Sequence, residues 1–158
     1  MDEVGRAIGT DGMIGGQVMD LEWEGEKPTR QKVDYVHRRK TAALLGSSLV
    51  VGGMLAGADA RTLRALRRFG EPFGLAFQIV DDILNVQRAG QALGKKPGGD
   101  ERLGKITWPA AHGLEASQKD VTRLLDQAAK EATAFGTWVD HFLGLADYIS
   151  VRRQAGRR

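Results

Sequence analysis

The sequence of 158 residues contains no cysteine, and this absence excludes several classes of site. Without cysteine there is no disulfide framework, no thiolate zinc site and no cysteine nucleophile. The absence agrees with a reducing compartment, and we expect a cytoplasmic protein. The first eleven residues contain Asp2, Glu3, Arg6 and Asp11, a composition that differs from the apolar core of a signal peptide.

The sequence also lacks an apolar run long enough to cross a membrane. Residues 42–58 carry no charge, but they fall short of the roughly 18 apolar residues that a span requires, and glycine and serine dilute them. A helix buried on all sides by its own protein has the same composition. We therefore expect a buried helix here and no membrane span.

The balance of charge is only mildly basic, with a formal net charge of +3 and a pI near 9.4. This favours anionic ligands without identifying them. The basic tail at residues 151–158 has no interleaved aromatic residues, so it is a weak indication of nucleic-acid binding. We expect no nucleic-acid partner. The content of 42% hydrophobic and 27% charged residues is typical of a globular chain.

The hydrophobic residues recur at spacings of three and four, which predicts helices along most of the chain. We expect one helix over 3–21, a polar break at 22–28, and a helix that Thr29 caps and that continues into the uncharged segment. Asp59 is a second candidate cap, for a helix that ends near Val86. Glycine, Pro97 and charged residues predict a long loop over 88–106, and further helices follow to about residue 152. No strand pattern appears, so the predicted class is all-α.

The first candidate site is a polar stripe on an otherwise apolar helix. Gln78, Asp81, Asp82 and Asn85 lie at i, i+3, i+4 and i+7, which places them on one helical face. Two adjacent carboxylates that face an interior require cations, and oxygen ligands suit Mg²⁺. The alternative is a solvated acidic edge of an amphipathic helix.

The second candidate group consists of basic residues. Lys40 and Thr41 lie at the start of the uncharged helix, where a buried ammonium group needs an anion. The alternative is a lysine at a helix end that buries its aliphatic part and keeps its ammonium group in solvent. Lys95 and Lys105 lie in or next to the glycine-rich loop, whose composition suits contact with phosphate oxygens. A flexible surface loop with incidental lysines is the alternative. Gln17 and Asp20, which lie at i and i+3 after a pair of glycines, are a further and weaker pair of candidate site residues.

In combination and order, these segments resemble the isoprenyl (polyprenyl) diphosphate synthases, in particular the bacterial farnesyl and geranylgeranyl diphosphate synthases. The resemblance extends over nearly the whole chain and rests on GMIGGQVMDL (12–21), HRRKTAALL (37–45), GLAFQIVDDILN (74–85), LGKKPGGDERLGKITWPAAHGLEAS (93–117) and ADYISVRR (146–153). It implies the helical bundle of the isoprenoid (terpenoid) synthase fold. Because family members are about twice as long, residues 1–158 are identified as the C-terminal portion of a polyprenyl synthetase domain.

The resemblance also implies an activity and a role for each candidate. The family condenses an allylic diphosphate with isopentenyl diphosphate to give short-chain isoprenyl diphosphates, and the enzymes are Mg²⁺-dependent prenyltransferases. The expected roles are as follows: Mg²⁺ binding by Asp81 and Asp82; contact with the allylic diphosphate by Lys40 and Lys95, with Lys105 as a further basic contact; oxygens near the developing cation from Thr41 and Gln78; the isopentenyl wall from Phe77; and pocket lining by Gln17 and Asp20.

The sequence departs from the family pattern in two ways. Asn85 stands where the family motif DDxxD has its last aspartate, so metal affinity is expected to fall modestly. The first aspartate-rich motif is absent, since the sequence contains no other Asp-Asp pair. We therefore expect catalysis to need the N-terminal half, supplied by a partner chain or in a homodimer. The alternative function is a non-catalytic or regulatory subunit of a prenyl diphosphate synthase.

Overall fold

The computed structural model describes residues 2–92 and 105–155 and shows only helices and their connections in these ranges. The predicted all-α class is therefore confirmed. The α-helices are α1 (Asp2–Ile8), α2 (Met13–Glu22), α3 (Arg30–His37), α4 (Ala43–Leu55), α5 (Ala60–Ala92), α7 (Trp108–His112), α8 (Leu114–Ala132) and α9 (Val139–Ala155). A π-helical segment, Arg38–Ala42, joins α3 to α4, and a 3₁₀ segment, Thr133–Trp138, precedes α9.

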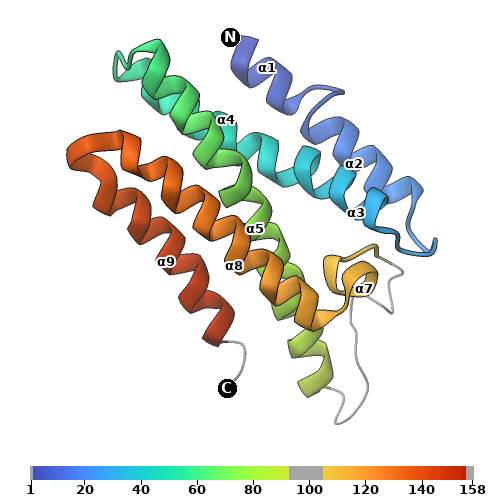
Figure 1. The fold of residues 1–158 in the computed structure, drawn as a ribbon. Helices are drawn as coiled ribbons and strands as arrows, with labels where there is room; N and C mark the ends of the chain where they lie inside the picture. The colour runs from blue at the N-terminus through green and yellow to red at the C-terminus, as the bar shows by residue number, and fades with distance from the viewer. Residues whose placement is uncertain (1, 93–104, 156–158) are drawn as a thin grey trace.

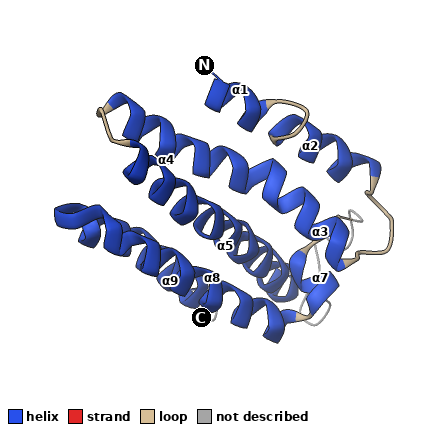
Figure 2. Ribbon diagram, turned by 45° about the horizontal axis from the view of Figure 1, so that its top comes forward, coloured by secondary structure: helices blue, strands red, loops and turns tan. Residues whose placement is uncertain are grey.

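The long helix α5 is the centre of the arrangement. It contacts α4 on one side and α8 and α9 on the other, and the short helix α7 contacts it near its C-terminal part. Figure 1 shows α1 and α2 beside the α3–α4 run at one edge and α9 at the opposite edge, and Figure 2 shows the same order of helices. The result is a helical bundle in which helices that are consecutive in sequence mostly lie next to each other.

The core lies along the face of α5 that meets α4 and α8. Its largest fully buried side chains include Phe69, Leu75, Ile79 and Ile83 of α5, at the helical spacing that the sequence predicted. The ring of Phe69 stacks on Phe73 and meets other core rings edge-on. Burial of this apolar face holds the polar stripe of the same helix at a fixed position.

Three side-chain caps begin the helices around the core. Thr29 Oγ1 accepts a hydrogen bond from the backbone N–H of Lys32, at 3.3 Å, and Asp59 Oδ1 accepts one from Thr62, at 2.7 Å. Both caps were predicted from the sequence. Thr107 Oγ1 accepts a hydrogen bond from the N–H of Ala110 and begins α7.

The structure corrects two predicted boundaries. The single helix expected over 3–21 is two helices, because the backbone turns between Gly9 and Gly12 through a hydrogen bond between these two residues. Helix α5 continues to Ala92, past the end predicted near Val86, so residues 88–92 of the predicted loop are helical, and residues 93–104 of it lie outside the described residues. Arginine, glutamine and alanine after Val86 are good helix formers, which explains the extension.

The uncharged segment forms α4 and is only partly buried. Ser47 and Val50 are buried against its neighbours, whereas Leu44 and Leu55 on another side are exposed. The expectation of burial on all sides is therefore wrong for the described residues. Among the helices within 2–92 and 105–155, none combines the length and apolar content needed to cross a membrane.

Candidate active site

The polar stripe of α5 faces a pocket of about 230 Å³ that also borders α2, the end of α3, the π-helical segment and the segment before α7. Most of its lining side chains are polar or charged. They are Asp20, Val36, His37, Lys40, Thr41, Gln78, Asp81, Asp82, Asn85, Lys105, Ile106 and Thr107. Residues up to 87 positions apart in sequence thus line one cavity. The hypothesis drawn from the sequence required that the acidic and the basic candidate residues meet in a common pocket.

The π-helical segment sets the position of Lys40 and Thr41. A π-turn widens a helix locally and is frequent at functional sites. Lys40 Nζ donates a hydrogen bond to Asp20 Oδ2 of α2, at 2.7 Å. Helix α2 approaches this closely because Gly16 has no side chain: a Cβ there would lie 2.5 Å from the backbone nitrogen of Lys40. The ammonium group of Lys40 therefore has an anionic partner within the chain.

Thr41 and Gln78 contact each other across the two helices that carry them. Thr41 Oγ1 donates to Gln78 Oε1, at 2.6 Å, and Gln78 Nε2 donates to Asp82 Oδ1, at 3.2 Å. This chain of hydrogen bonds fixes the orientation of the Gln78 amide. It also leaves a row of oxygen and nitrogen atoms along the pocket wall.

The two adjacent aspartates have different surroundings. Asp81 is 38% exposed, and its Oδ1 accepts a hydrogen bond from Arg152 Nη2 of α9, at 3.1 Å. Asp82 is buried, and its Oδ2 lies 2.7 Å from His37 Nε2 and accepts a hydrogen bond from the backbone N–H of Trp108, also at 2.7 Å. Asp81 is therefore the carboxylate that solutes can reach more easily.

The donors around the pocket suit a hard cation. Asp81, Asn85 and Asp20 supply oxygen atoms to one cavity, and Mg²⁺ takes oxygen ligands and completes its shell with water and substrate phosphates. The part of the chain described here contains no group of three or more acidic, histidine or cysteine side chains arranged as a complete metal site. A partial oxygen set fits an ion that the substrate also ligates.

Most of the ten predicted site residues lie in the same pocket. Seven line the pocket: Asp20, Lys40, Thr41, Gln78, Asp81, Asp82 and Lys105. Gln17 is half-buried on α2 and is not part of the lining, and Phe77 lies beneath the guanidinium of Arg152, 5.2 Å from its ring centroid. Lys95 lies outside the described residues.

Sequence reasoning assigned no role to His37 or Thr107, and it did not include Arg152 among the site residues. His37 stands four residues before Thr41, a spacing that places both on one face of a continuous helix. That spacing was a usable signal for His37. The contact of Arg152 with Asp81 joins residues 71 positions apart, so no local pattern could have shown it.

Comparison with known proteins identifies the family of the chain. The profile of the family described as Polyprenyl synthetase matches residues 7–140. The chain belongs to this family. The resemblance read from the sequence motifs is therefore confirmed, and with it the terpenoid-synthase type of fold.

The family's curated relatives include prenyl-transferring enzymes. A dimethylallyltranstransferase from Fischerella ambigua is 38% identical over 95% of this chain and 44% of its own length. A chloroplastic geranylgeranyl pyrophosphate synthase from Capsicum annuum is 38% identical over 95% of this chain and 41% of its own length. The chain thus spans about half the length of the curated relatives it matches.

Solved structures show the same relation. An FPP/GFPP synthase from Zymomonas mobilis superposes with a TM-score of 0.76 at 31% identity, over 94% of this chain and 49% of that one. A decaprenyl diphosphate synthase from Rhodobacter capsulatus gives a TM-score of 0.83 at 26% identity, over 96% of this chain and 59% of that one.

Proposed function

We propose that this chain is the C-terminal portion of a prenyltransferase that condenses an allylic diphosphate with isopentenyl diphosphate to make short-chain isoprenyl diphosphates of the farnesyl or geranylgeranyl type. The observation that carries the proposal is the single pocket that collects Lys40, Lys105 and Asp81 from three separate segments. Membership of the polyprenyl synthetase family supports it, because its relatives are named for this chemistry.

The charges in the pocket suit a diphosphate bridged by a cation. Lys40 and Lys105 provide ammonium groups for phosphate oxygens, and Lys95 is proposed as a third. Asp81 and Asn85 are proposed to hold Mg²⁺, with Asp82 beside them. Bound Mg²⁺ would supply Lewis-acid stabilisation of the negative charge that develops on a departing diphosphate.

The neutral polar groups are assigned to the organic part of the substrate. The Thr41 hydroxyl and the Gln78 amide are held by their mutual hydrogen bond, so their oxygen dipoles are oriented before substrate arrives. They are proposed to face the developing allylic cation. Phe77 is proposed as part of the isopentenyl wall, and Gln17 and Asp20 as lining of the allylic side.

The described chain leaves apolar side chains uncovered at the edge formed by α1, α2 and α4. These exposed residues are Val4, Ile8, Ile14, Val18, Leu21, Leu44, Met54 and Leu55. Large exposed apolar patches indicate contact with another protein surface. Because the chain spans about half the length of its relatives, we propose that apolar helices carrying the other half of the synthase cover this edge, within a homodimer or a paired chain.

Reconstitution tests the function. The 158-residue chain is mixed with, or joined to, an N-terminal half that carries a first aspartate-rich motif, and prenyl transfer from an allylic diphosphate is measured with Mg²⁺. We expect activity only in the combined protein, and its loss in Asp81→Ala. Full turnover by the chain alone would contradict the need for a second half.

The same experiment separates the alternative function, a non-catalytic or regulatory subunit. In that case the chain would associate with a complete synthase and change its rate, and Asp81→Ala in this chain would leave that effect unchanged. Activity that depends on Asp81 in the reconstituted enzyme would decide in favour of the catalytic assignment.

A further inference from the structure

His37 is a buried residue at the end of α3 that the proposed chemistry does not use. It is 4% exposed, and its Nε2 lies 2.7 Å from Asp82 Oδ2 of α5. The two residues stand 45 positions apart in sequence. A buried imidazole aimed at a buried carboxylate indicates a specific interaction between these two helices, because neither group is stable in the core without a partner.

Asp82 already has three protein partners. Besides His37, the backbone N–H of Trp108 donates to Oδ2 at 2.7 Å, and Gln78 Nε2 donates to Oδ1 at 3.2 Å. A carboxylate offers about four acceptor positions, so the chain itself occupies most of them. Asp81, by contrast, has one side-chain partner among the residues that the structure describes, Arg152, and is partly exposed.

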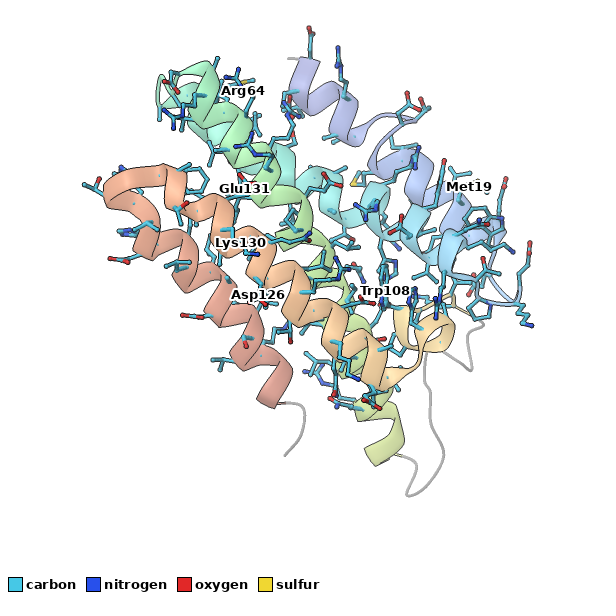
Figure 3. All side chains as sticks on the ribbon, in the orientation of Figure 1. Met19, Arg64, Trp108, Asp126, Lys130 and Glu131 are labelled. Atoms are coloured by element: carbon cyan, nitrogen blue, oxygen red, sulfur yellow. The ribbon has the colours of Figure 1, made fainter. Side chains whose placement is uncertain are left out.

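The three partners of Asp82 belong to three segments that carry proposed substrate contacts. His37 immediately precedes the π-helical segment with Lys40, and Gln78 contacts Thr41. Trp108 begins α7 and stands three residues after Lys105. Figure 3 shows Trp108 on α7, and this helix contacts both α3 and α5.

Ring contacts reinforce the same junction. The ring centroids of His37 and Trp108 lie 5.7 Å apart, and Trp108 stacks on His112 at 4.5 Å with an interplanar angle of 7°. Trp108 Nε1 also donates to Asp120 Oδ2 of α8, at 3.0 Å. The start of α7 is thus tied to α3, α5 and α8, and Asp82 is the charged group at the centre of these contacts.

We propose that His37 and Asp82 form a positioning pair, which holds the Lys40 turn and the Lys105 segment at a fixed spacing across the diphosphate pocket. Asp81 then carries the cation, and Asp82 acts through His37 and the Trp108 amide. This inference deepens the proposed function and rests on it. It distinguishes two neighbouring aspartates that the sequence motif presents as equivalent.

The test compares pyrophosphate binding to the 158-residue chain with and without Mg²⁺, by isothermal titration calorimetry. The matched variants are Asp81→Ala and Asp82→Ala, with His37→Leu, which removes the donor, and His37→Gln, whose side-chain amide keeps one. We expect Asp82→Ala and His37→Leu to weaken binding by about tenfold or more under both conditions, since the lysines lose their spacing. Asp81→Ala should weaken only the Mg²⁺-dependent part, and His37→Gln should retain most of the affinity.

A second measurement needs no ligand and keeps the pair testable if a variant is poorly folded or if the chain does not bind pyrophosphate. Amide hydrogen exchange at Trp108 should be slow in the unaltered chain and in His37→Gln, and about tenfold faster or more in His37→Leu. Unchanged exchange in a folded His37→Leu chain would overturn the positioning pair, as would an Asp82→Ala variant that loses only Mg²⁺-dependent binding. Absence of any pyrophosphate binding by the unaltered chain, with the expected exchange pattern, would count against the proposed function alone.

Discussion

Lys40 and Asp20 form an ion pair of 2.7 Å that joins α2 to the π-helical turn between α3 and α4. The Asp20 side chain is largely buried, and the Lys40 side chain is about one-third exposed. The aspartate thus holds the ammonium group at the pocket wall, where a diphosphate would replace or share it as the counter-charge.

Replacing Lys40 should lower both the activity and the stability, through different contacts. Lys40→Met is expected to lower kcat/KM of the reconstituted enzyme by about a hundredfold, because one preorganised donor to the leaving group is lost. The free energy of unfolding should fall by about 1–3 kcal/mol, because the largely buried Asp20 carboxylate loses this partner. Lys119→Met, which removes an exposed ion pair with Glu115 on α8, is the control and should leave the kinetics unchanged. Equal effects of both variants would argue against a diphosphate contact at Lys40.

Asn85 offers a change that should improve cation binding. Asn85→Asp places a further carboxylate on the pocket wall, one helical turn after Asp81. The added negative charge should lower, several-fold, the Mg²⁺ concentration that gives half-maximal pyrophosphate binding. Asn85→Ala should raise it. Calorimetric titration over a range of Mg²⁺ concentrations measures both, and identical Mg²⁺ dependence in the two variants would exclude a cation at this position.

A glycine on α5 permits the close contact with the π-helical segment. A Cβ at Gly74 would lie 2.8 Å from the Cα of Ala42, so Gly74→Ala must push the two helices apart. We expect a loss of about 1–3 kcal/mol in the free energy of unfolding. Gly52→Ala on α4 meets no atom within 4 Å and should stabilise the helix by about 0.5–1 kcal/mol. Urea denaturation of both variants checks the difference in sign.

His112 should make stability depend on pH. Burial lowers the pKa of its imidazole below the ordinary value of 6.5, although Asp120, 3.8 Å from Nδ1, opposes this shift. The unfolded chain therefore binds more protons than the folded chain just below pH 6.5, and stability falls as the pH decreases through this window. His112→Phe, which keeps a ring against Trp108, should flatten the dependence between pH 5 and 7 as measured by urea denaturation. If the free energy of unfolding of His112→Phe depends on pH as steeply as that of the unaltered chain, other groups cause the dependence.

The aromatic cluster should dominate the stability of the core. Phe69 is fully buried and contacts three other phenylalanine rings, so Phe69→Ala is expected to cost about 3–5 kcal/mol. Tyr148→Ala on α9 removes a side chain that is 63% exposed and should change stability far less. A comparison of urea midpoints at equal slope measures the contrast. Similar losses for both variants would contradict the assignment of the core to this face of α5.

Much of the fold was predictable because its causes are local in sequence. The spacing of Phe69, Phe73 and Val80 specifies a helix with one buried face, and the hydroxyl of Thr29 specifies where α3 begins. The break between α1 and α2 was missed, since glycines tolerate both helix and turn and only the packing of α2 on Lys40 decides between them.

The sequence by itself determined the all-α class, the family and the chemical inventory of the site, because periodicity and motif composition are carried by neighbouring residues. Tertiary structure alone decided which partners and which degree of burial each of these residues has. Asp81 and Asp82 are adjacent and chemically identical, yet one meets Arg152 near solvent and the other meets His37 and the Trp108 amide in the core. The rotation of about 100° between successive helical residues gives them different neighbours, and these neighbours come from helices distant in sequence.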